Sequence, residues 1–135
     1  MKQFSLNVLA AERSFYEGEA VSLVVPNLDG SYGIQADHSN MIGAIVPGVL
    51  RIKTPEGDEI VAAVSEGLVK VENNQVHVLV NTAERPEEID DNRARRAVEE
   101  AQEALLQKKS IQDYHAAQAK MTRALNRLKV KDKYN

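Results

Sequence analysis

The sequence predicts a β + α fold, in which an N-terminal antiparallel β-sandwich, or flattened barrel, precedes a C-terminal antiparallel two-helix hairpin. Two observations predict it. Apolar and polar residues alternate along seven or more short segments before residue 85, with turn residues about every 8–12 positions. From residue 91 onward, apolar residues recur at spacings of three and four, the period of an amphipathic helix. We therefore expect a sandwich over residues 1–85 and a linker with the hairpin over residues 86–135.

The change of pattern occurs around Pro86. Proline has no N–H to donate to a strand ladder, so Pro86 ends the last strand. Asp90 or Asp91 then offers a carboxylate to the free N–H groups at the start of a helix. The net charge changes here too, because residues 1–90 carry 6 Lys+Arg and 14 Asp+Glu, whereas residues 91–135 carry 11 and 6. A net charge of −8 followed by one of +5 predicts different partners for the two halves.

The strand segments begin near the N-terminus. Phe4, Leu6 and Val8 alternate with polar residues, which predicts a strand with one buried face. No helical stretch separates this segment from those that follow, so a sandwich is favoured over β-α-β units. The other predicted strands cover residues 20–25, 41–46, 49–53, 59–64, 67–71 and 75–80.

Turn residues separate these strands. Pro26 begins a run of turn formers that ends the second strand, and residues 30–38 read as a glycine-containing loop. Residues 47–48 are Pro-Gly, which predicts a tight turn. Asn73 and Asn74 tolerate a positive φ, so they suit a two-residue hairpin turn.

The first helix is predicted over about residues 91–108. Its apolar stripe is mostly alanine, and small side chains let another helix approach closely. Lys108 and Lys109 stand where this helix ends, a favourable place beside its negative C-terminus. The stripe consists of Ala94, Ala97, Val98, Ala101, Ala104 and Leu105.

The second helix is predicted over about residues 111–129. Ser110 and Asp113 have the spacing of a capping box, with Asp in place of the usual Glu. Apolar residues then recur at the spacing of a coiled-coil contact face with one polar member. This predicted seam consists of Ile111, Tyr114, Gln118, Met121, Leu125 and Leu128.

Lys120, Arg123 and Arg127 form a basic face on the second helix, away from the seam at 100° per residue. A solvated surface is the plain interpretation of such a face. Nucleic acid is disfavoured as a partner, because the whole chain is acidic and no aromatic stacking platform accompanies the basic residues.

Composition points away from catalysis. The chain has no cysteine, which excludes a disulfide framework, a thiolate nucleophile and a Cys-ligated zinc. His38, His77 and His115 are scattered and make no metal-binding motif. No apolar run approaches the roughly 18 residues of a membrane span, so a membrane connection must run through a protein partner. These features indicate a binding or regulatory protein.

The linker offers one candidate ligand site. Glu84, Asp90 and Arg93 lie close together in sequence at a helix start, and helix N-termini favour anions. An Asp there can accept hydrogen bonds from the ring or ribose of a nucleotide. The plainer interpretation is that Asp90 is an N-cap and Arg93 a surface charge.

Several motifs of the chain together are typical of one known family. Residues 30–34, Gly-Ser-Tyr-Gly-Ile, with His38, are similar to a glycine-rich loop that ends in histidine, and residues 47–52 are similar to the strand that follows this loop. Residues 89–94 match an Ile/Leu-Asp-x-x-Arg-Ala nucleotide motif that some members of the family have, and residues 123–128 match the end of its second helix. Over essentially its whole length, the chain therefore resembles the ε subunit of bacterial F-type ATP synthase.

The resemblance implies a non-catalytic subunit that needs no cofactor. It implies that the sandwich docks on the γ subunit and the c-subunit ring of a proton-translocating complex on the cytoplasmic face of the cell membrane. The hairpin would fold against the sandwich or extend along γ toward the catalytic β and α subunits, where its basic face would help to block ATP hydrolysis. The partner-binding residues so implied are Ser31, Tyr32, Gly33, His38, Met41 and Ile42.

The resemblance also implies ATP as a regulatory ligand. Glu100 stands where members that bind ATP well tend to carry an arginine, so we expect weak binding. Ser31 stands where many members have an acidic residue facing the c ring, and residues 36–37 are Ala-Asp where Pro-Gly is usual. The implied nucleotide-binding residues are Glu84, Ile89, Asp90, Arg93, Ala94, Arg123 and Arg127.

A free-standing β-sandwich that binds a ligand is the alternative from a different class. The hairpin would then drive oligomerisation, with the predicted seam as its self-association face.

Overall fold

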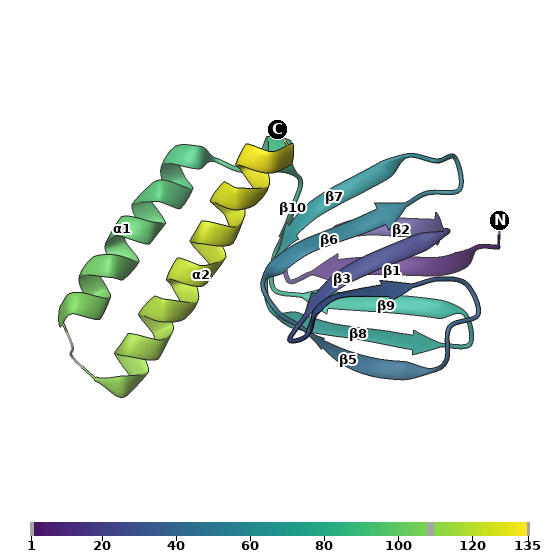
Figure 1. The fold of residues 1–135 in the computed structure, drawn as a ribbon, viewed down its shortest axis with the longest axis horizontal. Helices are drawn as coiled ribbons and strands as arrows, with labels where there is room; N and C mark the ends of the chain where they lie inside the picture. The colour runs from purple at the N-terminus through teal and green to yellow at the C-terminus, as the bar shows by residue number, and fades with distance from the viewer. Residues whose placement is uncertain (1, 108–109, 135) are drawn as a thin grey trace. The chain divides into compact units, whose positions relative to one another are not determined.

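The computed structural model describes residues 2–107 and 110–134 (Figure 1). The chain divides into two compact units, Met1–Arg85 and Pro86–Asn135. Within the described residues, the first unit contains only strands and their connections, and the second contains one short 3-10 helix and two α-helices. The predicted fold class, a sandwich followed by two helices, is confirmed.

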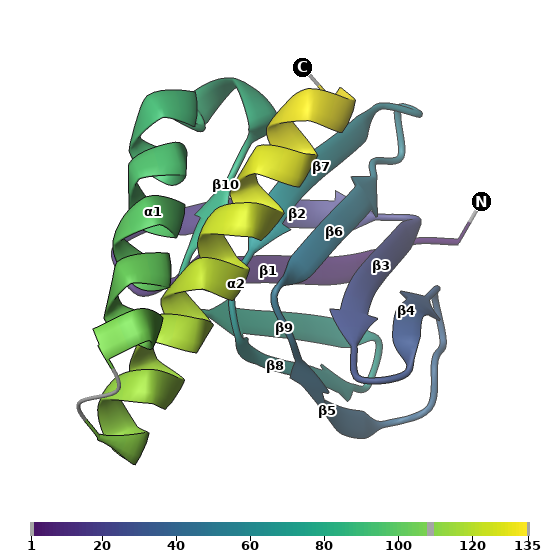
Figure 2. The same ribbon diagram turned by 60° about the vertical axis from the view of Figure 1, so that its left-hand side comes forward.

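The first unit is a two-layer sandwich of five-stranded sheets (Figures 1 and 2). One sheet, sheet A, has the strand order β2-β1-β9-β8-β5, and the other, sheet B, has the order β10-β7-β6-β3-β4. The strands are β1 (Phe4–Ala10), β2 (Ser14–Ala20), β3 (Ser22–Asn27), β4 (Gly30–Ile34), β5 (Met41–Ile45), β6 (Gly48–Lys53), β7 (Glu59–Val64), β8 (Gly67–Glu72), β9 (Gln75–Val80) and β10 (Ala83–Glu84).

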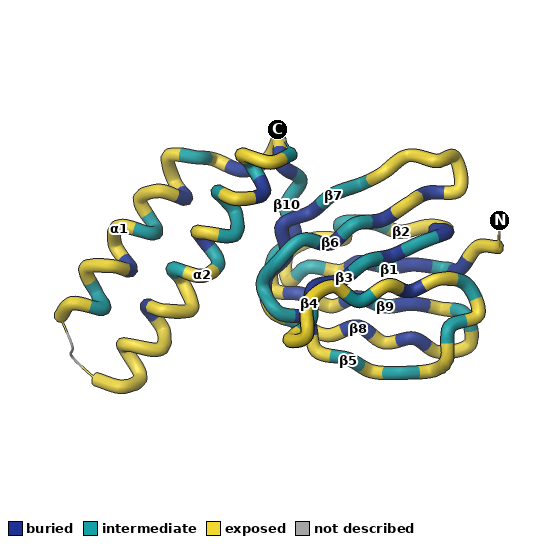
Figure 3. Tube along the Cα trace, viewed as in Figure 1, coloured by how far each residue is buried: buried dark blue, intermediate teal, exposed yellow. Residues whose placement is uncertain are grey.

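The core lies between the two sheets. Buried and exposed positions alternate along many strands (Figure 3), because successive side chains point to opposite faces of a sheet. The alternating apolar residues of β1, Phe4, Leu6 and Val8, are all buried, as the sequence pattern predicts. The largest fully buried side chains of sheet B are Leu23, Ile34, Leu50 and Ile52.

Three strands escape the sequence prediction, namely β2, β4 and the two-residue β10. β2 was not predicted, because Ser14–Ala20 is polar and lies at an edge of sheet A, where only one neighbour constrains its pattern. β4 occupies the segment predicted as a loop. It is also an edge strand, and its glycines weaken the strand pattern in the sequence. Pro26 does not end β3, which continues to Asn27. β3 pairs with β6 only as far as Val24, so at Pro26 it pairs with β4 alone.

The pairing of the sheets contains one exception to the predicted antiparallel arrangement. β1 and β9 run parallel, with Ser5 opposite Gln75, and every other pair is antiparallel among the residues described. The turn at residues 47–48 does not make a hairpin, because β5 and β6 belong to different sheets. The predicted hairpin turn at Asn73 and Asn74 is confirmed, and both residues have a positive φ.

The second unit begins with the 3-10 helix η1 (Pro86–Glu88), followed by α1 (Asp91–Gln107) and α2 (Ile111–Tyr134), which run antiparallel (Figure 1). α2 extends five residues beyond the predicted end at residue 129. Lys131 ties this extension to the start of the unit by donating from Nζ to the Pro86 carbonyl at 3.1 Å. The predicted charges at Lys108 and Lys109 lie outside the described residues. Neither described helix is long and apolar enough to cross a membrane.

The face that α2 buries is not the predicted seam. Ala117, Ala124 and Val130 are buried, whereas Ile111 is 77% exposed and Leu125 48%. The remaining seam residues are exposed (Tyr114 and Gln118) or half-buried (Met121 and Leu128). The buried row is displaced by about one residue, because alanines allow closer contact between helices than leucines do. The alanine-rich stripe of α1 behaves as predicted, with Ala94 and Ala101 buried and its other members half-buried.

Candidate functional site

The predicted partner-binding residues gather at one margin of the sandwich. β4 and β5 are the edge strands of the two sheets, and residues 35–40 connect them. Ile42 is 71% exposed, although large apolar side chains are usually covered. Ser31 and Gly33 are exposed, and Tyr32, His38 and Met41 are half-buried. The structure therefore brings together six residues that the resemblance selected.

A histidine and a tyrosine brace this margin. The Tyr32 hydroxyl lies 2.8 Å from His38 Nε2, and His38 Nδ1 lies 2.8 Å from the Ser39 carbonyl oxygen. A carbonyl only accepts, so in the neutral imidazole Nδ1 carries the hydrogen and Nε2 accepts from the tyrosine hydroxyl. The two rings meet edge to face, with their centroids 5.7 Å apart. The contacts fix the orientation of His38.

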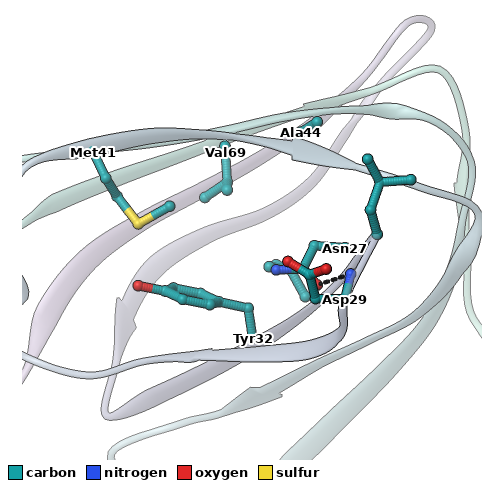
Figure 4. Close-up of a pocket in the computed structure, with 9 residues that line it drawn as sticks. Asn27, Asp29, Tyr32, Met41, Ala44 and Val69 are labelled. Atoms are coloured by element: carbon teal, nitrogen blue, oxygen red, sulfur yellow. Dashed lines mark hydrogen bonds between the residues drawn. The ribbon is translucent and has the colours of Figure 1, made fainter.

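An open pocket of about 190 Å³ lies beside these residues, between the ends of the two sheets (Figure 4). Tyr32 and Met41 approach it from opposite sheets. Gly43 lies close to two other lining residues, because a Cβ there would lie 3.0 Å from Met41 Cε and 3.5 Å from Val69 Cγ1. The lining residues are Val25, Asn27, Leu28, Asp29, Tyr32, Met41, Gly43, Ala44 and Val69.

Leu28 is a surface residue that sequence reasoning missed. It is 84% exposed at the turn between β3 and β4, where the Asp29 N–H donates to Asn27 Oδ1 at 3.0 Å. That side-chain hydrogen bond shapes the turn and leaves the leucine without cover among the described residues. An apolar residue among turn formers is the signal that was available in the sequence.

An exposed apolar row, also missed, crosses the outer face of sheet A. Leu9 of β1 lies opposite Leu79 of β9, which lies opposite Leu68 of β8, which lies opposite Ala44 of β5. All four are exposed. Each leucine alone resembles an ordinary outward-facing residue, so only the strand register shows that they adjoin. Such a continuous apolar row on a sheet is typical of a protein contact surface.

At the start of α1 the structure favours the plain interpretation of Asp90. Its Oδ1 accepts from the Arg93 backbone N–H at 3.1 Å, and its carbonyl accepts from the Ala94 N–H at 3.0 Å. Asp90 is thus the N-cap of α1. The adjacent Asp91 has a buried Oδ1 without a hydrogen-bond partner among the described residues, a feature that the sequence did not indicate.

The other predicted nucleotide-binding residues are distributed between the units. Glu84 belongs to β10 of the sandwich unit, whereas the rest belong to the hairpin unit. Ile89 and Ala94 are buried, and the Arg93 residue is exposed. Because the helices are antiparallel, the first turn of α1 lies at the same end of the hairpin as the last turns of α2.

The basic residues of α2 differ in their surroundings. Lys120 is exposed, whereas Arg123 and Arg127, one turn apart, are half-buried and each makes polar interactions. Glu100 is exposed on α1. The structure thus leaves Lys120 and Glu100 accessible to a ligand or partner.

These observations define a class of protein, a β-sandwich with an exposed apolar row that is followed by a helical hairpin. Comparison with known proteins then identifies the family. Residues 3–86 match the model for the ATP synthase delta/epsilon chain beta-sandwich domain, and residues 87–132 match that for its long alpha-helix domain. The chain belongs to the ATP synthase delta/epsilon family, which confirms the resemblance that the motifs indicated.

Similar proteins agree with this assignment. The ATP synthase epsilon chain of Caldanaerobacter subterraneus is 44% identical over 134 residues, covering 98% of this chain and 96% of the relative. That of Ruminiclostridium cellulolyticum is 40% identical and covers 95% of each chain.

Two solved structures have the same fold. A chain of the Euglena gracilis mitochondrial ATP synthase OSCP/F1/c-ring structure superposes with a TM-score of 0.78 at 19% identity, covering 92% of this chain and 78% of that one. A chain from the Tetrahymena thermophila mitochondrial ATP synthase central stalk and c-ring structure superposes with a TM-score of 0.63 at 13% sequence identity. The match covers 94% of this chain and 95% of that one.

Proposed function

We propose that this protein is a non-catalytic central-stalk subunit of a proton-translocating rotary ATP synthase and couples the γ subunit to the c-subunit ring. Family membership over both units carries the proposal. The protein needs no cofactor, and it sits peripherally at the cytoplasmic face of the cell membrane through the complex alone.

Two surfaces of the sandwich suit two partners. The margin with Ser31 and His38 faces the c ring, because Ser31 stands where many family members have an acidic residue that faces it. The flat apolar row across sheet A, centred on Leu79, is then the surface available to γ. Apolar contact in the centre of an interface supplies much of its affinity.

Capture of a purified γ subunit tests this assignment. Leu79→Glu places a charge in the middle of the apolar row and should lower the affinity for γ at least tenfold, about 1.4 kcal/mol. Gln75→Glu is the matched control, since Gln75 is exposed on the same face of β9 outside the row. Equal losses in both variants would exclude the row as the γ surface. A homo-oligomer that ignores γ would support the alternative of a free-standing sandwich protein.

The hairpin is the inhibitory part of the protein. In an extended state, the basic face of Lys120, Arg123 and Arg127 meets acidic residues of a catalytic β subunit. Charge pairs shielded from water in an interface contribute more than the roughly 0–1 kcal/mol of an exposed pair. Deleting residues 89–135 should therefore raise ATP hydrolysis by the reconstituted complex and leave its assembly intact.

A triple substitution separates the charges from the rest of the hairpin. Replacing Lys120, Arg123 and Arg127 with Ala should release most of the same hydrolysis. Lys129→Ala is the control, because Lys129 is exposed and lies roughly opposite Arg127 on the helix at 100° per residue. If the deletion leaves hydrolysis at the wild-type rate, the hairpin is not the inhibitory element.

ATP is a weak regulatory ligand that competes for the same arginines and favours the folded hairpin. It occupies the start of α1, with Arg123 and Arg127 near its phosphates, and Glu100 weakens binding by adding a like charge, which costs about 1 kcal/mol near a surface. Calorimetry should show tighter binding in Glu100→Arg. Glu99→Arg makes the same charge change one residue away and should improve affinity less. Wild-type affinity in the low micromolar range would contradict the role of Glu100.

A further inference from the structure

The loop between β4 and β5, residues 35–40, crosses from sheet B to sheet A without pairing as a strand, and it is held by a distant turn. Asn74, at the turn between β8 and β9, accepts on Oδ1 from the Asp37 backbone N–H at 2.7 Å. Its Nδ2 donates to the Gln3 carbonyl at 2.9 Å. Its own carbonyl accepts from the Ser5 N–H at 3.2 Å. One residue therefore joins three segments of the chain.

The neighbouring residue adds a fourth connection. The Asn73 backbone N–H donates to Asn40 Oδ1 at 3.0 Å, so the turn holds the loop near both ends. Asn73 and Asn74 have φ values of 52° and 62°, a region that asparagine tolerates better than most residues. Asp37 has a φ of 63°, and its N–H points to Asn74 in that conformation. Positive φ values in both the turn and the loop therefore accompany the hydrogen bonds that join them.

We propose that Asn74 is a positioning residue for partner docking. By fixing residues 35–40, it presents His38 at the margin of the sandwich before any partner arrives. A surface that is already ordered loses less conformational entropy on binding and therefore binds more tightly. The inference rests on the proposed function, because it assumes that this margin meets the c ring.

The Lys2 and Asp37 side chains contribute little to this arrangement. Their ion pair is 3.1 Å long, but the two side chains are 83% and 59% exposed, and exposed pairs are weak. The Asn74 side chain is the part of the network whose removal should release the loop.

Asn74→Gly is the test, with Asn73→Gly as its matched control. Glycine adopts a positive φ freely, so both variants keep the turn. Only Asn74→Gly removes side-chain hydrogen bonds to the loop and to Gln3, because the connection from Asn73 uses its backbone N–H. Losing one or two such bonds should speed amide hydrogen exchange at Asp37 about five- to tenfold relative to the control.

Docking is measured on the same variants, as the affinity of the full chain for γ bound to a c ring. We expect Asn74→Gly to bind about five- to tenfold more weakly than Asn73→Gly, while both melt at similar temperatures. Asn74→Asp restores an acceptor for the Asp37 N–H but not a donor for Gln3, so loop protection and affinity should return in part. This variant also decides the question if Asn74→Gly does not fold.

Two results would overturn the inference. If exchange at Asp37 is equal in the two glycine variants, Asn74 does not hold the loop. If exchange rises but affinity stays within twofold of the control, the loop is held for a reason other than docking. Failure of the wild-type chain to bind any stalk component would instead refute the proposed function, and the docking role of Asn74 with it.

Discussion

The two units bury different kinds of side chain. The sandwich encloses large residues such as Phe4, Leu23 and Leu50, all essentially inaccessible to solvent. In α1, by contrast, the only buried side chains are alanines, Ala94 and Ala101. Apolar stabilisation scales with the area removed from water, at about 25 cal/mol per Å². Each buried side chain of the sandwich core therefore contributes more apolar stabilisation than a buried alanine of α1 does.

Long-range hydrogen bonds from side chains occur in both units. In the sandwich, Arg13 Nη2 donates to the Ala83 carbonyl at 2.7 Å. In the hairpin unit, Lys131 Nζ donates to the Pro86 carbonyl at 3.1 Å. Local caps add to this bond, such as Ser110 Oγ accepting from the Asp113 N–H at 3.0 Å.

The largest expected effect comes from a substitution in the core of the sandwich. Leu50→Ala removes a fully buried side chain and should lower the free energy of unfolding by about 2–5 kcal/mol. Urea denaturation of residues 1–85, which we expect to fold without the hairpin, measures it. A loss below 1 kcal/mol would mean that the sandwich is no better packed than the hairpin.

The next effect tests whether the hairpin requires small residues. Ala101→Leu inserts a large side chain at a buried position and should destabilise the hairpin by about 1–3 kcal/mol. Ala119→Leu is the control, because Ala119 is exposed on α2 and should tolerate the change within about 0.5 kcal/mol. Thermal unfolding of the two variants, followed by the helical circular dichroism signal, measures the difference in stability between them. Equal effects would contradict an alanine-lined contact.

A smaller effect concerns the cap at the start of α1. Asp90→Ala removes the carboxylate that accepts from the Arg93 N–H and should cost about 0.5–2 kcal/mol. Asp90→Asn retains a capping oxygen and should recover most of the loss. The rate of amide hydrogen exchange over the first turn of α1 measures this loss of stability. If Asp90→Ala binds ATP as wild type does, Asp90 has only a capping role.

The smallest effect is the pH dependence of β2. Burial raises the pKa of Tyr16 above its usual value of 10.0, and the carboxylates of Glu56 and Glu19 add to the shift. The folded state therefore holds the phenol proton more tightly than the unfolded chain does. This stability is complete below pH 10 and declines as the pH rises through the folded pKa. Tyr16→Phe should flatten the alkaline part of the stability profile, measured by urea denaturation from pH 9 to about 11.

The sequence was most informative where one side of an element is buried. Alternation in β1 and β9, and the alanine stripe of α1, predict their buried faces correctly because burial imposes a period on each. β2 and β4 were missed since they lie at sheet edges with few buried positions. The predicted seam of α2 is wrong. Leucines are more hydrophobic than alanines, so a pattern based on hydrophobicity selects the leucine positions, although the helix buries alanines.

The candidate sites show the same limit. Motifs selected Tyr32 and His38, and the structure adds that they bond to each other. The apolar row of Leu9, Leu68 and Leu79 depends on strand register, which no single segment of sequence contains. Asn74 was recognised as a turn residue, but its bonds to Asp37 and Gln3 join positions far apart in the chain.

The parallel pairing of β1 with β9 also has a consequence for how the chain assembles. Residues 5–10 meet residues 75–80, so sheet A cannot close before Val80 has been synthesised. At about 5–20 residues per second, β1 waits roughly 4–14 s for its neighbour on the growing chain. During that time β2 can cover one edge of β1 as a local hairpin, while the other edge stays open to pairing with foreign strands. Sequence-distant pairing of this kind slows folding, so we expect the joining of β1 to β9 to be a slow step in the assembly of sheet A.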